Sequence, residues 1–155
     1  MKLYIKQKVF SWNDKFSVKD ENGEDRYFVE GEVFSLGKKL HIYDRSGNEM
    51  AFIKQKVLSF MPTFTVYIGE REIAEIRKNF TLFNQKYTID GLGWEVNGGF
   101  LAHDYVITDG LREIVEIHKA WMTWGDCYEL DIAHPGDEIA ALAVVLAIDC
   151  AMEKK

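Results

Sequence analysis

The chain has 155 residues, of which 47% are hydrophobic and 14% aromatic, and its net charge is −6. This size fits one domain over residues 1–155 with a single core, and the composition excludes a disordered protein. The charge is uneven: residues 1–72 hold 12 basic and 11 acidic side chains, whereas residues 73–155 hold 7 and 14. Because general nucleic-acid binding needs a basic field, we expect no nucleic-acid partner.

The N-terminal segment and the cysteines predict a cytoplasmic protein. Residues 1–10 carry lysines at positions 2, 6 and 8 and no continuous apolar run, so they do not predict a signal peptide or a membrane anchor. Cys127 and Cys150 are too few for a disulfide framework, and we expect both to be reduced. Neither these cysteines nor the four scattered histidines have the spacing of a metal site, so no metal or other cofactor is expected.

Four similar segments predict four β-hairpins. Residues 4–18 (YIKQKVFSWNDKFSV) and 52–66 (FIKQKVLSFMPTFTV) are identical at eight of fifteen positions, and weaker copies begin at Ile76 and Ile117. In each copy, apolar and polar side chains alternate before a turn-like tripeptide, which is typical of a half-buried strand entering a hairpin. The apolar side chains expected to line the interior include Ile5, Val57, Phe80 and Trp121.

The opposite face of these segments is basic. Its candidate residues for contact with an anionic lipid or ligand are Lys6, Lys8, Lys54, Lys56, Arg77 and Lys78. If the copies lie close together, these side chains form one outer patch. The simpler interpretation is that outward lysines keep strands soluble and block edge pairing.

Each copy also carries an aromatic pair across its turn. The first members are Trp12, Phe60, Phe83 and Trp124, and the second members are Phe16, Phe64, Tyr87 and Tyr128. Aromatic pairs across a hairpin stabilise a sheet by roughly 0.2–1 kcal/mol each. Because every copy has such a pair, we interpret these side chains as core packing and not as ligand-stacking residues.

Two further strand pairs lie between the hairpins and complete a barrel. They are predicted at 26–31 and 39–44 in the first half of the chain, and at 92–96 and 103–108 in the second, with turn signals between them. The total is twelve strands, six in each of two pseudo-repeated halves (1–72 and 73–133). Closing this antiparallel sheet removes its edges and leaves a lumen wider than side chains alone would fill.

The C-terminal helix, predicted over residues 136–152, fills that lumen. Residues 139–152 (IAALAVVLAIDCAM) are apolar on every side except at Asp149, so the helix must be surrounded. Fourteen residues span ~21 Å, less than the ~30 Å core of a bilayer, so the helix is not predicted to be transmembrane. We expect Asp149 at the barrel mouth, solvated or paired with a base, so that Asp149→Leu costs about 1 kcal/mol or less. The alternative is a buried structural ion pair.

The pattern resembles the tubby C-terminal-like fold and, within it, the LURP-one-related family with its bacterial YxjI-like members. The residues that carry this resemblance are 4–18 with their repeat, the segment 43–56 (YDRSGNEMAFIKQK) and the helix segment 138–149 (EIAALAVVLAID). The resemblance implies a twelve-stranded antiparallel barrel around a C-terminal apolar helix. The superfamily that this resemblance implies also includes the tubby proteins, which bind phosphoinositide head groups, and the phospholipid scramblases, which act at membranes with calcium. This chain has no Asp-x-Asp-x-Asp calcium loop, and no tubby-type basic pocket can be aligned to it residue by residue.

Three functions remain open from the sequence. The first is a non-catalytic module that recognises an anionic membrane surface through the basic residues, which places the protein in the cytoplasm and peripherally at a membrane. The second is a protein-interaction scaffold without a lipid role, with Asp104, Asp109, Glu113 and Glu116 as its candidate surface. The third is an enzyme, for which a Cys127–His118 nucleophile is the only candidate pair, and coincidence is the favoured interpretation of that pair. The oligomeric state is not predicted.

Overall fold

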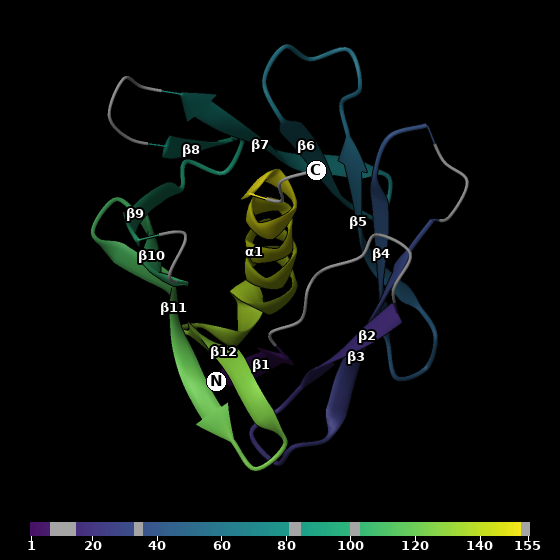
Figure 1. Cartoon of the computed structure of the whole chain (residues 1–155), viewed down its shortest axis with the longest axis vertical. Helices are drawn as coiled ribbons and strands as arrows, with labels where there is room; N and C mark the ends of the chain where they lie inside the picture. Colours follow the sequence, from purple (N-terminus) through teal and green to yellow (C-terminus); the bar gives the residue numbers. More distant parts are fainter. Residues whose placement is uncertain (7–14, 33–35, 81–84, 100–102, 153–155) are drawn as a thin grey trace.

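The computed structural model describes residues 1–6, 15–32, 36–80, 85–99 and 103–152, and twelve strands and one α-helix lie within it (Figure 1). The strands are β1 (Lys2–Lys6), β2 (Lys15–Lys19), β3 (Asp25–Gly31), β4 (Lys39–Asp44), β5 (Glu49–Gln55), β6 (Thr63–Ile68), β7 (Arg71–Phe80), β8 (Gln85–Asp90), β9 (Glu95–Gly99), β10 (Asp104–Asp109), β11 (Arg112–Met122) and β12 (Gly125–Ile132). A 3₁₀ turn, η2 (Pro135–Asp137), leads into α1 (Glu138–Met152). The predicted twelve-stranded architecture with a C-terminal helix is confirmed.

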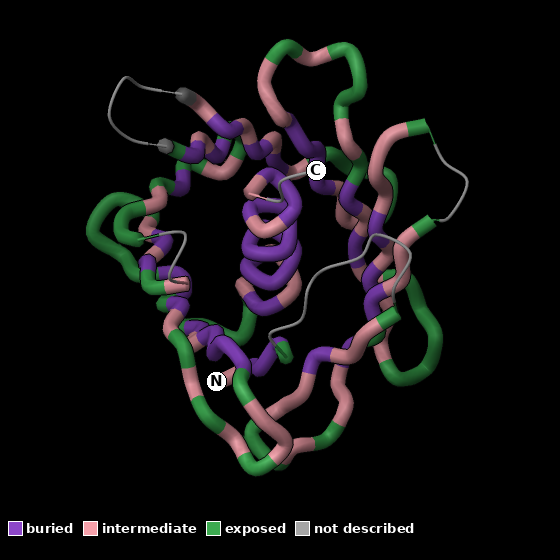
Figure 2. The backbone as a smooth tube through the Cα atoms, in the orientation of Figure 1, coloured by how far each residue is buried: buried purple, intermediate pink, exposed green. Residues whose placement is uncertain are grey.

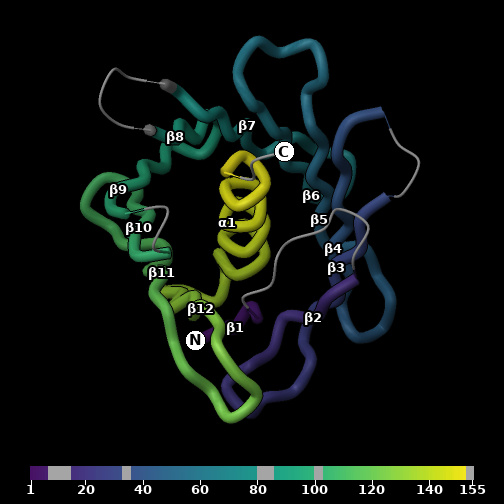
Figure 3. Tube along the Cα trace, viewed as in Figure 1, coloured from purple at the N-terminus to yellow at the C-terminus, as the bar shows by residue number. Residues whose placement is uncertain are grey.

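The strands form one antiparallel sheet in the order β8-β7-β6-β5-β4-β3-β2-β1-β12-β11-β10-β9. The sheet wraps around α1, but β8 and β9 form no ladder with each other (Figure 3). The barrel is therefore nearly closed, whereas the sequence predicted a fully closed one. We call the gap between β8 and β9 the seam. It divides the second half of the chain: β7 and β8 continue from β6, whereas β9 to β12 return beside β1. Closure depends on the pairing of β1 with β12, which joins the two ends of the strand sequence.

Alternating side chains of the strands form the interior, as period-2 patterning predicts. Figure 2 shows that α1 is buried over most of its length inside the ring of strands. Ile5, Ile53, Ile76 and Ile117, which start the four repeats, are all buried in one core cluster with α1. Val57 and Trp121 are exposed, so their predicted lumen position is wrong. Val57 lies in the turn after β5, and Trp121 is the last residue but one of β11, so both side chains lie at the rim of the barrel and not in its enclosed interior. The side chain of Phe80 lies outside the described residues.

Strand β9 occupies 95–99, where the sequence predicted 92–96 followed by a turn at 97–99. The difference arises at Gly98, which pairs with Tyr105 inside the β9–β10 ladder. Gly98 has a φ of 129°, and a Cβ there would lie 2.6 Å from the carbonyl oxygen of Asp104. Glycine is therefore needed here for close backbone approach within a strand, not for a turn.

A bidentate ion pair anchors the start of α1 to the sheet. Arg26 Nε and Nη2 lie 2.6 and 3.0 Å from the Glu138 carboxylate, and the Tyr27 hydroxyl donates to the same carboxylate. Burial, followed by the Glu138 carboxylate, raises the pKa of Tyr27 to about 12, so the hydroxyl keeps its proton. Glu138 therefore fixes the first turn of the helix on β3.

The meander also sorts the connections between strands onto two rims of the barrel. Because neighbouring strands are antiparallel throughout, all odd-numbered strands end at one rim of the barrel and all even-numbered strands end at the other. The described residues that connect an odd-numbered strand to the next even-numbered strand are 32, 36–38, 56–62, 103 and 123–124. The opposite rim carries the short turns at 20–24, 45–48, 69–70, 91–94 and 110–111 and the start of α1. The two rims therefore differ in the kind of connection they bear.

Replacement of Glu138 tests the helix anchor. Glu138→Ala removes the acceptor of Arg26 and of the buried Tyr27 hydroxyl, so the free energy of unfolding in urea should fall by about 1–3 kcal/mol. Glu138→Gln keeps an acceptor oxygen and should cost less. If the two variants lose the same amount, the acceptor role of Glu138 is wrong.

Candidate functional site

Large apolar side chains are exposed on the rim that carries the odd-to-even connections. Leu36 is 81% exposed, Leu58 98%, Phe60 99% and, at the end of β11, Trp121 74%. With Val57, these residues account for five of the seven large apolar side chains that are exposed in the described part of the chain. We call Leu36, Val57, Leu58, Phe60 and Trp121 the apolar rim. Such a concentration at one end of a molecule typically marks an interaction site.

Two neighbouring connections bring most of the apolar rim together. The backbone N–H of Gln55 donates to the carbonyl oxygen of Lys38 at 2.8 Å, which joins the 32–38 connection to the end of β5. A Cβ on Gly37 would lie 2.4 Å from Val57 Cγ1, so the two connections are in direct contact. Figure 1 shows that β4 and β5, from which the described residues of these two connections extend, lie side by side. Leu36, Leu58 and Phe60 therefore belong to one apolar projection.

Lysines surround the base of this projection. Lys54 lies on the outer face of β5, directly opposite Lys39 of β4 in the ladder, and it is exposed. Lys56 follows at the end of β5, exposed and 3.5 Å from the Glu75 carboxylate. The structure thus brings Lys54 and Lys56, two of the residues predicted from the sequence, to the apolar projection.

The other predicted basic residues do not join them in one patch. Lys6 is exposed at the end of β1, but three strands separate β1 from β5, which is about 19 Å at ordinary strand spacing. Arg77 lies on the outer face of β7, 3.6 Å from Asp90. Lys78 is buried, so its predicted outward position is wrong. It follows Ala74 and Ile76 at intervals of two residues and lies on the same buried face of β7 as they do. Lys8 lies outside the described residues.

Lys6 instead lines a small groove on β1 and β2. The groove has a volume of about 230 Å³ and is also lined by Lys15, Lys19 and Trp124. Two of its three lysines have carboxylate partners: Lys19 lies 2.7 Å from Asp25 and Lys15 lies 3.5 Å from Glu30. Trp124 packs edge-on against Tyr4 at 6.1 Å and lies 5.9 Å below the Lys19 ammonium. These contacts make Trp124 a packing residue, as expected.

The aromatic pairs have divided roles. Their second members Phe64, Tyr87 and Tyr128 are buried in the core, which confirms the packing interpretation for them. Phe60, the first member in the second copy, is almost fully exposed, so the packing interpretation is wrong there. Trp12 and Phe83 lie outside the described residues. One feature of the sequence could have predicted this exposure. Leu58 and Phe60 fall in a connection between strands, and such connections run over the protein surface.

The opposite rim is acidic. Its described carboxylates are Asp20, Glu21, Glu24, Asp25, Asp44, Glu49, Glu70, Glu72, Asp90, Glu95, Asp109, Glu113, Asp131 and Asp137. Lys2, Lys19, Arg26, Arg45, Arg71 and Arg112 are its described basic residues. The molecule is therefore polarised along the barrel, with apolar tips and lysines at one rim and an excess of carboxylates at the other.

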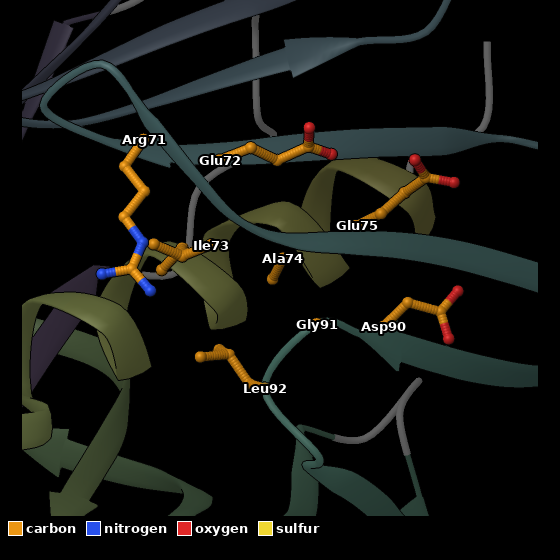
Figure 4. Close-up of a pocket in the computed structure, with 8 residues that line it drawn as sticks. All are labelled: Arg71, Glu72, Ile73, Ala74, Glu75, Asp90, Gly91 and Leu92. Carbon is orange, nitrogen blue, oxygen red and sulfur yellow. The ribbon is translucent and has the colours of Figure 1, made fainter.

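A hollow beside the seam offers no comparable site. It has a volume of about 370 Å³ and lies between the start of β7 and the connection from β8 to β9 (Figure 4). Glu75 and Asp90, two of its carboxylates, already have Lys56 and Arg77 as partners. A Cβ on Gly91 would lie 2.7 Å from the carbonyl oxygen of Ile73, so this hollow marks a close backbone approach. We assign it to packing at the seam.

A polar cluster inside the barrel surrounds Asp149. The Asp149 side chain is 11% exposed. Of the two forms of the prediction, the solvated one is therefore wrong, and the one in which Asp149 is paired with a base agrees with the neighbouring His103. The Tyr128 hydroxyl donates to Asp149 Oδ2, and His103 Nε2 lies 3.5 Å from Oδ1. His103 stacks on Tyr128, with 4.5 Å between ring centroids and 13° between the planes. These partners offset the cost that burial of an isolated carboxylate would carry.

Cys127 and His118 do not form a nucleophile. The Cys127 thiol donates to the carbonyl oxygen of Ala120 at 3.5 Å, while His118 Nε2 lies 2.6 Å from the Glu129 carboxylate. Burial, together with the charges of Glu129 and Asp126, raises the pKa of the Cys127 thiol. A protonated thiol beside an acidic neighbour is a poor nucleophile. The arrangement favours a structural role for both residues.

Two further findings concern membranes and metals. In the part of the chain that the structure describes, no helix is both long and apolar enough to cross a bilayer. Among the same residues, no three His, Cys, Asp or Glu side chains are grouped in a way that would hold a metal ion.

Substitution of Asp149 measures the interior cluster. Asp149→Leu leaves the Tyr128 hydroxyl without its acceptor in a buried site, so the free energy of unfolding should fall by about 2 kcal/mol or more. Asp149→Asn retains an acceptor oxygen and should lose less. Urea denaturation of both variants makes the comparison, and a loss of about 0.5 kcal/mol or less for Asp149→Leu would return Asp149 to the predicted solvated position.

Tyrosine ionisation gives a second test of the interior. Burial raises the pKa of Tyr4, Tyr27, Tyr43, Tyr87, Tyr105 and Tyr128 above the ordinary value of 10.0, to about 12 for Tyr27 and Tyr87. The folded state keeps protons that the unfolded chain releases near pH 10, so this stabilisation is intact below pH 10 and lost toward pH 12. Absorbance at alkaline pH should show tyrosinate forming together with unfolding. Full ionisation near pH 10 with the fold intact would contradict the burial.

Comparison with known proteins completes the description. A family model described as LURP-one-related matches residues 1–149. The chain is 34% identical over 149 residues to the uncharacterized protein YxjI of Bacillus subtilis (strain 168), a match that covers 96% of this chain and 92% of YxjI. An X-ray structure of a protein from Arabidopsis thaliana has the same fold, with a TM-score of 0.65 and 16% identity over 96% of this chain and 90% of that one. As the resemblance predicted, the chain belongs to the LURP-one-related family.

Proposed function

We propose that this protein is a non-catalytic module that binds peripherally to anionic membranes through the apolar rim and the lysines beside it. The observation that carries the proposal is the projection formed by Leu36, Leu58 and Phe60, which is exposed and apolar although it belongs to connecting loops. Apolar loop tips of this kind enter the boundary between head groups and acyl chains, and full burial of one Leu or Phe gains about 1.5–3 kcal/mol.

The lysines supply the preference for negative charge. Lys54 and Lys56 lie immediately behind the apolar projection, where lipid phosphates would be once the tips are inserted. Each lysine near an anionic surface contributes about 1 kcal/mol, an attraction that salt weakens. Lys6 lies at the same rim on β1 and adds to the attraction at longer range.

Charge also orients the molecule. The rim opposite the apolar rim is rich in carboxylates, which an anionic membrane repels. A molecule attracted at one end and repelled at the other docks end-on, with the start of α1 away from the lipid. Because anionic lipids concentrate in the cytoplasmic leaflet, the membrane surface that we propose for this interface is the cytoplasmic one.

Co-sedimentation with vesicles tests the proposal. The wild-type protein should bind phosphatidylcholine vesicles that contain phosphatidylserine or a phosphoinositide more tightly than phosphatidylcholine alone, and more tightly at low salt than at physiological salt. Leu58→Ser/Phe60→Ser should weaken binding by roughly tenfold or more, because two apolar anchors are lost. Lys54→Glu should remove most of the preference for anionic vesicles.

Matched variants on the acidic rim serve as controls. Leu111→Ser changes an exposed leucine in the turn between β10 and β11, and Arg71→Glu reverses an exposed charge at the start of β7. Both should bind vesicles like the wild type. The proposal fails if the wild type binds no vesicle at either salt concentration, or if the control variants lose as much binding as the apolar-rim variants.

A further inference from the structure

A row of aromatic side chains lies on the outer face of β4, β5 and β6, outside the hydrophobic core. The ladders place His41 of β4 opposite Phe52 of β5, and Phe52 opposite Tyr67 of β6. Ring centroids of His41 and Phe52 lie 4.7 Å apart, and those of Phe52 and Tyr67 5.9 Å apart. The same register continues to Glu30 of β3 at one end and to Glu72 of β7 at the other. The row therefore consists of three rings between two carboxylates, on the outside of a barrel.

This row forms the floor of a groove with acidic walls. The groove has a volume of about 580 Å³, and Glu49 and Glu70 line it together with the rings of Phe52 and Tyr67. Lys54 also lines it, at the end nearer the apolar rim. Glu49 is 45% exposed, so its carboxylate remains open to solvent although it contacts His41.

His41 already shows what this groove stabilises. Its Nδ1 lies 2.6 Å from the Glu49 carboxylate and its Nε2 lies 2.9 Å from the Glu32 carboxylate. Burial lowers the pKa of His41, but the two carboxylates outweigh it, so the net pKa is raised. A planar cation between carboxylates and beside an aromatic ring is thus favoured at this place.

We infer that the groove on β4, β5 and β6 is a docking site for arginine side chains of a basic segment in a partner protein. A guanidinium stacks flat on the Phe52 and Tyr67 rings while its N–H groups donate to the Glu49 and Glu70 carboxylates. Lysine has no plane to stack and cannot form the paired hydrogen bonds, so arginine is preferred. The two carboxylates repel anionic ligands, so lipid head groups are disfavoured at the end of the groove that holds Glu49 and Glu70.

The inference goes beyond membrane binding and does not depend on it. Glu49 and Glu70 belong to the acidic rim, at the end of the strands away from the apolar rim. On a docked molecule the end of the groove that holds Glu49 and Glu70 would therefore lie away from the lipid, whereas its Lys54 end lies nearer the membrane. It can be tested in solution without vesicles, so failure of one proposal leaves the other standing.

Fluorescence anisotropy of a labelled peptide tests the site. The probe is a fluorescein-labelled peptide of alternating arginine and glycine, compared with peptides in which lysine or glutamate replaces arginine, at low and physiological salt. The wild-type protein should bind the arginine peptide several-fold more tightly than the lysine peptide and should not bind the glutamate peptide. Tyr67→Ser, which leaves the net charge unchanged, should weaken arginine binding by roughly tenfold and lysine binding less.

Two double variants that remove the same charge distinguish binding in the groove from general electrostatic attraction of the arginine peptide to an acidic protein. Glu49→Gln/Glu70→Gln should lose roughly tenfold in affinity for the arginine peptide. Glu113→Gln/Glu116→Gln removes the same charge from the exposed face of β11 and should retain wild-type affinity. Circular dichroism checks that each variant is folded. If Glu49→Gln/Glu70→Gln does not fold, the single variant Glu70→Gln, in the turn between β6 and β7, replaces it in the test. Equal losses in both pairs, equal affinity for arginine and lysine peptides, or no binding of the arginine peptide at low salt would each overturn the inference.

Discussion

The structure depends on enclosing a helix that is apolar on every side. Eleven of the fifteen residues of α1 are buried, and all but Glu138 of these are apolar. A sheet must wrap around such a helix, because burial of its apolar surface is the main favourable contribution to folding. The helix can be enclosed only if its polar side chains find partners inside the barrel. At the start of the helix, Arg26 and Tyr27 donate hydrogen bonds to Glu138. Near its end, Tyr128 donates a hydrogen bond to Asp149, and His103 lies beside the same carboxylate.

This enclosed helix explains why functional features lie on the outside. The interior is filled by α1 and the inward side chains of the strands, so binding surfaces must be built from connections and outer faces. In a meander of antiparallel strands, every odd-numbered strand ends at one rim and every even-numbered strand ends at the other. Apolar loops can therefore collect at one end while short acidic turns collect at the other. The resulting axial polarity supports both an end-on approach to a membrane and a separate acidic groove for a basic partner.

The sequence predicted the fold because its strongest patterns are local. The repeated segments alternate over several residues, so the burial of Ile5, Ile53, Ile76 and Ile117 follows from period-2 geometry. The position of α1 follows from its lack of a polar face. Patterning is weaker where alternation ends. The alternation predicts Val57 and Trp121 in the lumen, but Val57 follows the end of β5 and Trp121 lies near the end of β11, and both are exposed. The turn signal at Gly98 is likewise misleading, because Gly98 pairs within a ladder.

By itself, the sequence therefore determined which residues form strands, which face of each strand is buried, and that a C-terminal helix fills the barrel. Only the tertiary structure decided which surface residues meet, because proximity between strands depends on sheet order and register. It separated Lys6 from Lys54 by three strands, buried Lys78 and enclosed Asp149. It also placed Gly37 beside Val57 and aligned His41, Phe52 and Tyr67 across three strands. These pairs are distant or unpatterned in sequence, so no local rule could have brought them together.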